Sequence, residues 1–165
     1  MTQAPPQAPP LIVVDINCVV SQAISPSGAP AELLRRWRAG VLDLAISEAI
    51  LAEYERALLY ERVRRRHGRR VEEVREVVAE FREFAVLVEP SETPPIVADD
   101  SDDDKFLWCA AAGGVHYVVT RDEHLLRLRA YRGIRILTPA AFLVLLGASP
   151  EDEGGGAATG GRPVT

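Results

Sequence analysis

Acidic side chains recur in this sequence directly after short apolar runs. Asp15 follows the run Leu11–Val14, and Asp122 comes shortly after the run His116–Val119, separated from it by Thr120 and Arg121. A third acidic segment opens a helical pattern and contains Asp99, Asp100, Asp102, Asp103 and Asp104. Each of these acids alone is typical of a helix N-cap or a turn. Carboxylates that meet at one place, however, raise one another's pKa and destabilise the fold unless a cation neutralises them.

The position of Asp15 favours such a joint role. It stands between four apolar residues and the apolar segment Cys18–Val20, so we expect its carboxylate to be partly buried, where a charge must be paired or metal-bound. Oxygen ligands at a partly hydrated site suit Mg²⁺ or Mn²⁺, and no His/Cys set competes for a softer metal. The residues therefore predict an acidic site for a divalent metal, without selecting a reaction.

The apolar periodicity predicts the elements that would bring these acids together. We expect strands at 11–14, 41–46, 85–88, 116–119 and 134–137, separated by helices at 31–39, 48–59, 70–84, 103–112, 123–129 and 139–146, with Ser47 as an N-cap. Strands that alternate with helices pair in parallel through right-handed crossovers. The predicted fold is an α/β three-layer α/β/α sandwich with a central parallel sheet of four to five strands. Ligands of such sheets bind at the carboxyl ends of the strands.

A fourth acid can come from the helix that follows Ser47. Its apolar arc contains Ile50, Leu51, Tyr54, Ala57 and Leu58. Glu53 lies at one margin of this arc, whereas Glu48 and Glu55 lie nearer the other. Periodicity alone does not choose between these three glutamates.

The composition describes an ordinary globular chain. Its 165 residues are 47% hydrophobic and carry a formal charge of −5, which gives no global basic field and disfavours a protein that simply coats nucleic acid, but agrees with a carboxylate-rich site. Cys18 and Cys109 are too few for a disulfide framework and fit a reducing cytoplasm. We expect no signal peptide and no membrane span, a disordered leader at 1–10, one folded domain at 11–146 and a flexible Gly-rich tail at 147–165.

Four segments together resemble the PIN-domain family. The first is the strand that ends in Asp15-Ile-Asn17, and the second is Ser47-Glu-Ala-Ile-Leu-Ala-Glu53-Tyr54. The third is Asp100-Ser-Asp-Asp103-Asp-Lys-Phe-Leu, and the fourth is Thr120-Arg-Asp122. The resemblance covers about 11–146 in motif order and spacing. It departs from the family at Ile16, where Thr is common, and at Ser101, where Pro is common. The closing segment 131–142 is similar to the VapC-like branch of toxin components of toxin–antitoxin systems.

The resemblance implies a Mg²⁺- or Mn²⁺-dependent ribonuclease that cuts single-stranded RNA and leaves a 5′-phosphate. Asp15, Asp103 and Asp122 would be the main metal ligands, with Asp104 as the alternative to Asp103 in the acidic run. Glu53 would complete the catalytic set of Asp15, Glu53, Asp103 and Asp122. Asn17 and Thr120 would orient the carboxylates. A cognate antitoxin protein and a homodimer are the partners that the resemblance suggests beyond RNA.

Other features leave alternatives open. The arginines at 62, 64, 65, 66, 69 and 70 form either an RNA-phosphate contact or a solvated hinge between helices. A PIN-fold module that binds RNA or protein without cutting is the alternative function. A phosphoaspartate protein is disfavoured, because Asn17 stands where a phosphatase needs a second Asp and Lys105 is the only lysine in the chain.

Overall fold

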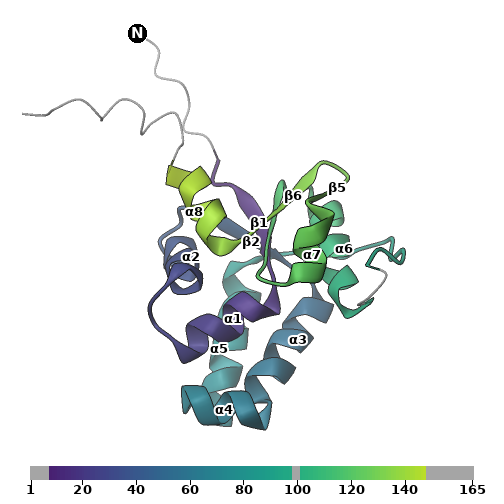
Figure 1. The fold of residues 1–165 in the computed structure, drawn as a ribbon. Helices are drawn as coiled ribbons and strands as arrows, with labels where there is room; N and C mark the ends of the chain where they lie inside the picture. Colours follow the sequence, from purple (N-terminus) through teal and green to yellow (C-terminus); the bar gives the residue numbers. More distant parts are fainter. Residues whose placement is uncertain (1–7, 98–100, 148–165) are drawn as a thin grey trace, which may run out of the picture.

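Short strands built from valine, leucine and isoleucine form the centre of the molecule (Figure 1). The computed structural model describes residues 8–97 and 101–147. Within this part of the chain the sheet has six strands in the order β3-β2-β1-β4-β6-β5. They are β1 (Leu11–Val14), β2 (Asp43–Ile46), β3 (Val86–Leu87), β4 (Tyr117–Val119), β5 (Ala130–Tyr131) and β6 (Ile134–Leu137). The five strands expected from the sequence are all present.

Strand β5 is the one strand of the described sheet that the sequence did not predict. It pairs antiparallel with β6, whereas the other pairings in the sheet are parallel. A two-residue turn joins β5 to β6, and both of its residues have positive φ, 48° at Arg132 and 80° at Gly133. Turns of this kind usually carry the sequence Asn-Gly or Asp-Gly. Here the first position is Arg132, so the sequence does not indicate the turn.

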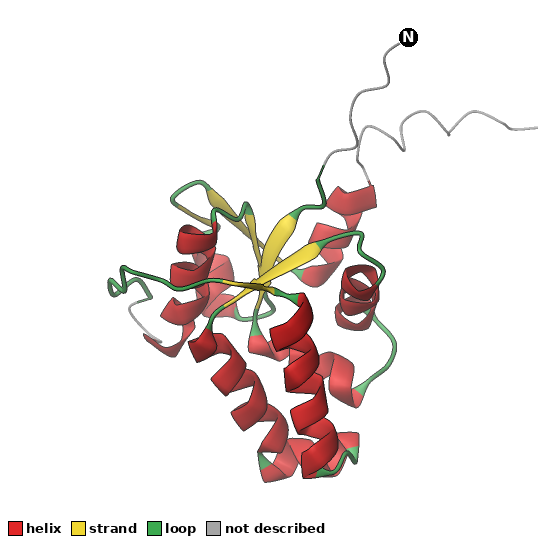
Figure 2. Cartoon of the chain, turned by 180° about the vertical axis from the view of Figure 1, so that it is seen from behind, coloured by secondary structure: helices red, strands yellow, loops and turns green. Residues whose placement is uncertain are grey.

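Helices cover both faces of the sheet and give the predicted three-layer α/β/α arrangement. Helices α2 and α8 pack on each other at one side of the sheet, and α6 and α7 lie at the other (Figure 1). The long helices α3 and α5 pack along each other and extend beyond the sheet (Figure 2). The bounds are α1 (Ile16–Ile24), α2 (Ala29–Arg38), α3 (Glu48–Leu59), α4 (Glu61–His67), α5 (Val71–Phe84), α6 (Asp104–Gly113), α7 (Glu123–Leu128) and α8 (Pro139–Gly147).

Two of these helices were not expected from the sequence. Helix α1 begins immediately after β1, and Asp15 is its N-cap, so strand and helix share one apolar run with no loop residue between them. Helix α4 carries much of the arginine segment and buries none of its residues. It is held to α3 by His67, whose Nε2 lies 2.9 Å from the carbonyl oxygen of Leu58 and whose Nδ1 accepts from the Arg69 amide at 3.0 Å. Tertiary contacts, rather than periodicity, therefore form α4.

Three aromatic rings pack helices α2, α3 and α5 against one another. Phe81 of α5 is fully buried, stacks on Trp37 of α2 with ring centroids 5.0 Å apart, and meets the edge of Tyr54 of α3 at 5.1 Å. Aromatic pairs in these geometries add to the free energy of apolar burial. This cluster fixes the position of α3 and hence of the acids that α3 carries.

The expected boundaries of the domain lie mostly outside the described residues. The predicted leader, 1–10, is described only from residue 8, and of the predicted tail, 147–165, only Gly147 is described, as the last residue of α8. Among the helices that the structure describes, none has the length and apolar character that crossing a membrane requires.

Replacing Phe81 by alanine is expected to lower the free energy of unfolding by about 3–5 kcal/mol, because it removes a buried ring and leaves a cavity. Urea denaturation measures the change. Phe84→Ala is the matched control on the same helix, since Phe84 is 66% exposed, and we expect a change within about 0.5 kcal/mol. Equal losses in the two variants would contradict the proposed core.

Candidate active site

The register of two neighbouring parallel strands brings Asp15 and Thr120 together. Val14 of β1 pairs with Val119 of β4, so the residues that follow them leave the sheet side by side. The Asp15 carboxylate is 1% exposed and accepts hydrogen bonds on both oxygens. Its Oδ1 accepts from the Ile16 amide at 2.7 Å, and its Oδ2 accepts from the Thr120 hydroxyl at 2.6 Å. Asp15 thus caps α1 and is oriented from β4 at the same time.

Thr120 also connects this carboxylate to Asp122. The Thr120 side chain is fully buried, and its Oγ1 accepts from the Asp122 amide at 2.9 Å while its hydroxyl proton goes to Asp15. Asp122 is the N-cap of α7, where its Oδ1 accepts from the His124 amide at 2.7 Å. The expected orienting role of Thr120 therefore has a concrete geometry, in which one hydroxyl group serves two acidic residues.

The structure distinguishes the three glutamates that the periodicity left open. Glu48 binds Arg82 of α5, and this hydrogen bond lowers the pKa of Glu48. Glu55 lies 3.6 Å from Arg75, also on α5. Glu53 points instead to α6, where its carboxylate pairs with the ammonium group of Lys105. Of the three, Glu53 is the one on the same side as the strand ends.

Lys105 is a residue of this site that the sequence reasoning missed. Its side chain is 14% exposed, that of Glu53 is 19% exposed, and the two form a direct ion pair. Burial lowers the pKa of Lys105 below its ordinary value, while the negative charge of Asp15 raises it. Lys105 therefore lies within the electrostatic reach of two of the predicted catalytic acids. The available signal was its place as the only lysine in the sequence, directly after the acidic run.

The two candidate acids of the third segment are both buried but differ in their contacts. Asp103 is 7% exposed and is the N-cap of α6. Asp104 is 2% exposed, and its two oxygens accept from the backbone amides of Ile96 and Val97 at 3.2 and 2.7 Å. Asp104 thus holds the preceding segment against α6. These bonds favour Asp103 over Asp104 for contact with a ligand, and they leave both as predictions. Asp99 and Asp100 lie outside the described residues.

A groove opens beside Glu53 at the junction of α1, α3 and α4. It encloses about 470 Å³ and is lined by apolar side chains together with polar ones, among them Asn17, Ser21, Glu53 and Arg66. Asn17 is exposed in the first turn of α1. The groove therefore places Asn17 near Glu53, and it brings one arginine of the basic segment to the same opening.

Buried neighbours make the surroundings of Asp15 apolar and electrically sensitive. The Tyr54 hydroxyl donates to the carbonyl oxygen of Val14, which ties α3 to the end of β1. Burial, with the charge of Asp15 as the next cause, raises the pKa of Tyr54 above its ordinary value. The same two causes raise the pKa of Cys18 to about 12, against a smaller opposing effect of Arg121. Both groups therefore stay neutral at physiological pH, and neither competes with Asp15 as an anion.

Comparison with known families decides the class of this chain. Residues 11–124 match the PIN domain (PIN_3). The chain belongs to the PIN-domain family. Proteins of this family are generally nucleases, which supports a nuclease-like role for this PIN domain. The sequence interpretation named this family from its four acidic segments, and that prediction is confirmed at the level of the family.

A solved structure supports the fold independently. The crystal structure of PAE2754 from Pyrobaculum aerophilum aligns with this PIN domain at a TM-score of 0.57 and 20% sequence identity, and the alignment covers 86% of this chain and 94% of that chain. An identity this low speaks for the shared fold alone. No curated protein matches the sequence.

The donors of the PIN domain have the chemistry of a divalent-metal site, although their present positions do not form one. Within residues 8–97 and 101–147, no three His, Cys, Asp or Glu side chains are grouped so that they could hold a metal ion. The candidate ligands are nevertheless all carboxylates, and Asp15 and Asp103 are both buried, as the N-caps of α1 and α6. The donor types are those that Mg²⁺ and Mn²⁺ prefer, and their carboxylates would have to converge further to share an ion.

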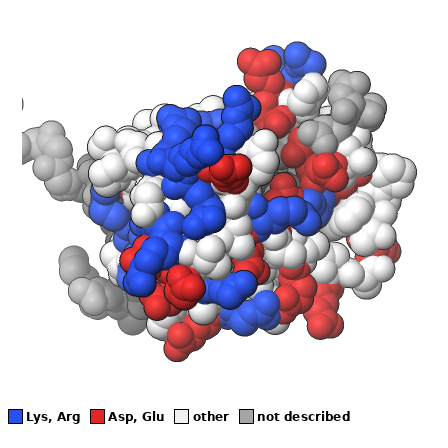
Figure 3. Space-filling view, turned by 90° about the horizontal axis from the view of Figure 1, so that it is seen from below, with Lys and Arg blue, Asp and Glu red and all other residues white. Residues whose placement is uncertain are grey.

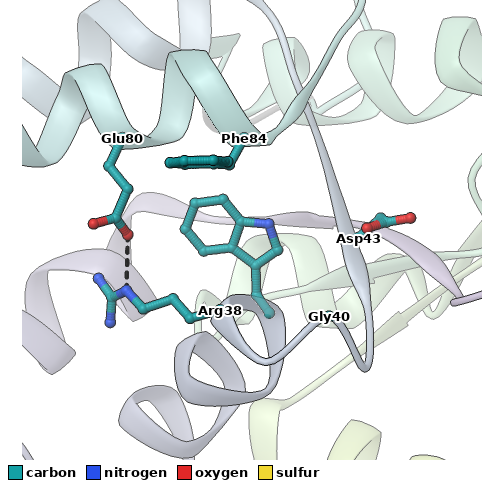
Figure 4. A pocket seen from close by; sticks show the side chains of 6 residues that line it. Arg38, Gly40, Asp43, Glu80 and Phe84 are labelled. Carbon is teal, nitrogen blue, oxygen red and sulfur yellow. Dashed lines mark hydrogen bonds and ion pairs between the residues drawn. The ribbon is translucent and has the colours of Figure 1, made fainter.

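A second pocket lies away from this site. It encloses about 450 Å³ and is lined by Trp37, Arg38, Gly40, Asp43, Glu80 and Phe84 (Figure 4). Arg38 donates to Glu80 at 2.7 Å across its mouth. Asp43 is the first residue of β2, so this pocket adjoins the amino-terminal end of that strand. The acids discussed above follow the carboxyl ends of the strands, where ligands of parallel sheets bind.

Thr120→Val is expected to destabilise the PIN domain by about 1–3 kcal/mol, because it removes the hydroxyl shared by Asp15 and the Asp122 amide without changing the side-chain volume. Thr120→Ser keeps the hydroxyl and should recover most of the loss. Thermal or urea unfolding of both variants measures the difference. A valine variant as stable as the serine variant would show that the network is not a structural requirement.

Proposed function

We propose that this PIN domain is a Mg²⁺- or Mn²⁺-dependent endoribonuclease that hydrolyses phosphodiester bonds of single-stranded RNA. The observation that carries the proposal is the buried Asp15 carboxylate, held by Thr120 beside Asp122 at the carboxyl edge of the sheet. Keeping a charge in this place is unfavourable unless a cation or fixed donors offset it. Membership of a family that generally consists of nucleases supports the same reading.

Asp15, Asp103 and Asp122 would hold the ion. A bound divalent ion supplies a water of lowered pKa and neutralises charge on the phosphate and on the leaving oxygen. The chain's own contribution is orientation. Thr120 and the Ile16 amide fix both oxygens of Asp15, and the first turn of α7 fixes one oxygen of Asp122. Fixed ligands need little reorganisation when the substrate arrives.

Glu53 would orient the attacking water and accept its proton. It lies at the groove that also contains Asn17, so a strand of RNA in that groove passes next to its carboxylate. For this role Glu53 must be free of Lys105 at the moment of reaction, because a carboxylate paired with an ammonium group is a weaker base.

The arginines around α4 would bind the RNA backbone. The face of the molecule that carries α4 shows groups of Lys and Arg side chains, interspersed with Asp and Glu (Figure 3). Arg62 and Arg66 are exposed on α4, and Arg66 also lines the groove beside Glu53. Phosphate contacts of this kind are independent of sequence and sensitive to salt. They would guide single-stranded RNA from α4 toward Asp15.

We further propose that the nuclease is the toxin component of a toxin–antitoxin pair in the cytoplasm. A cognate antitoxin would then cover the groove beside Glu53, where an arginine of the partner would pair with the carboxylates. A homodimer is the expected assembly. The support for these partners is the resemblance of the closing segment 131–142, of which β6 and the start of α8 are part.

Asp15→Asn is expected to abolish cleavage of RNA while leaving the fold intact. The amide keeps one acceptor for the Ile16 amide and can donate to the Thr120 hydroxyl, but it lacks the charge that holds a cation. Cleavage of a labelled single-stranded RNA in Mn²⁺ or Mg²⁺, with and without a chelator, measures the effect, and circular dichroism checks the fold. A folded variant that cuts at the wild-type rate would refute the mechanism.

Replacing Arg62 and Arg66 together by alanine is expected to weaken RNA binding and reduce its dependence on salt. Each lost phosphate contact should lower the slope of log affinity against log salt by about 0.7 for single-stranded RNA. Binding is measured in the Asp15→Asn background so that the RNA stays uncut. The control is Arg35→Ala with Arg36→Ala, which removes the same charge from α2, where both arginines bind Glu32. Identical slopes in the two double variants would exclude α4 as the RNA-binding surface.

The ion pair between Lys105 and Glu53 favours a second candidate function, a PIN-fold module that binds RNA without cutting it. In that case the pair would persist in the presence of metal. Wild-type protein would then bind the labelled RNA with the salt dependence described above and leave it uncut in Mn²⁺ and in Mg²⁺.

A further inference from the structure

The Lys105–Glu53 pair differs from the surface ion pairs of this molecule. Its two side chains are 14% and 19% exposed, whereas the pairs Arg38–Glu80 and Arg82–Glu48 leave their side chains at least 35% exposed. Surface pairs contribute little to stability, but a pair that is mostly desolvated interacts strongly and must be matched in charge. The Lys105–Glu53 pair is therefore a mostly desolvated contact between α6 and α3 and not a surface ion pair.

The position of Lys105 connects three of the acidic segments. It follows Asp103 and Asp104 on the first turn of α6, it contacts Glu53 of α3, and the charge of Asp15 at the end of β1 acts on it. An ammonium group here offsets the charge of Glu53 directly and lies within reach of the charge of Asp15. In the described part of the chain Glu53 is already paired with Lys105, and no three acids are grouped around a shared metal position.

We infer that Lys105 is a built-in cation of the metal-free site, which a divalent ion has to displace before Glu53 can take part in the reaction. The inference rests on the proposed metal-binding role of these carboxylates. Lys105 is thus a positioning residue that acts through Glu53. It neutralises Glu53 in the absence of metal, and it lowers the apparent metal affinity because only the molecules with the pair open are competent to bind.

The test measures Mn²⁺ binding by calorimetry on the full chain without RNA. Lys105→Met removes the charge and keeps most of the apolar stem, Lys105→Gln is a second neutral variant in case the first fails to fold, and Lys105→Arg is the control that keeps the charge. We expect the neutral variants to bind Mn²⁺ on the order of tenfold more tightly than wild type, as they would if the pair is closed in about nine molecules of ten. The arginine variant should bind like wild type.

Thermal unfolding of the metal-free proteins gives a second readout. The neutral variants should melt at a lower temperature than wild type without metal, since Glu53 and Asp15 then lack their cation, and saturating Mn²⁺ should raise their melting temperature more than it raises that of wild type. A role as an ordinary helix-to-helix contact would lower the melting temperature without tightening Mn²⁺ binding. A lower melting temperature without tighter Mn²⁺ binding would overturn the inference. So would an arginine variant that binds Mn²⁺ like the neutral variants, or the absence of Mn²⁺ binding in all four proteins.

The outcomes separate this inference from the proposed function. Wild-type protein that binds Mn²⁺ more weakly than the neutral variants but cuts no RNA would refute the nuclease and support the role of Lys105. Wild-type protein that cuts RNA and binds Mn²⁺ as tightly as the neutral variants would support the nuclease and refute the role of Lys105.

Discussion

The negative charge of Asp15 inside an apolar layer is the constraint on which the rest of the site depends. The carboxylate is almost fully buried, so every one of its neighbours must offset or orient that charge. The Ile16 amide and the Thr120 hydroxyl do so through hydrogen bonds, and Lys105 does so through its charge. The strand register is what makes this possible, because the pairing of Val14 with Val119 sets Thr120 beside Asp15.

The proposed divalent ion and Lys105 would supply positive charge to the same acidic residues. Carboxylates placed close enough to share a divalent ion repel one another when the ion is absent. A chain that folds before it meets metal therefore benefits from a cation of its own. In the scheme that we propose, Lys105 fills this role at the expense of metal affinity. Oxygens of Asp104 and Asp122 accept hydrogen bonds from backbone amides and so keep the surrounding segments in place. Stability of the metal-free fold and readiness for catalysis thus draw on the same side chains.

Sequence patterns predicted much of the fold, and the exceptions have physical reasons. The strand Ile134–Leu137 and the N-cap at Ser47 were predicted correctly, because β-branched runs and capping residues act locally. Helix α1 was missed because Asp15 ends a strand and caps a helix at a single residue. Helix α4 was missed because none of its residues is fully buried, so its sequence shows no apolar periodicity. Strand β5 was missed because Arg132 occupies a turn position that usually carries Asn or Gly.

For the site, the sequence by itself determined which residue types gather at the strand ends and the family to which they belong, since strand exits and motif spacing are written along the chain. Periodicity alone left Glu48, Glu53 and Glu55 open, because all three lie at the margins of one helical face, and only the resemblance of the motif singled out Glu53. The tertiary structure separates them by placing α5 against Glu48 and Glu55 and α6 against Glu53. It alone revealed Lys105 as part of the site. Charge balance depends on distances through space, and those exist only once α3, α6 and β1 have packed together.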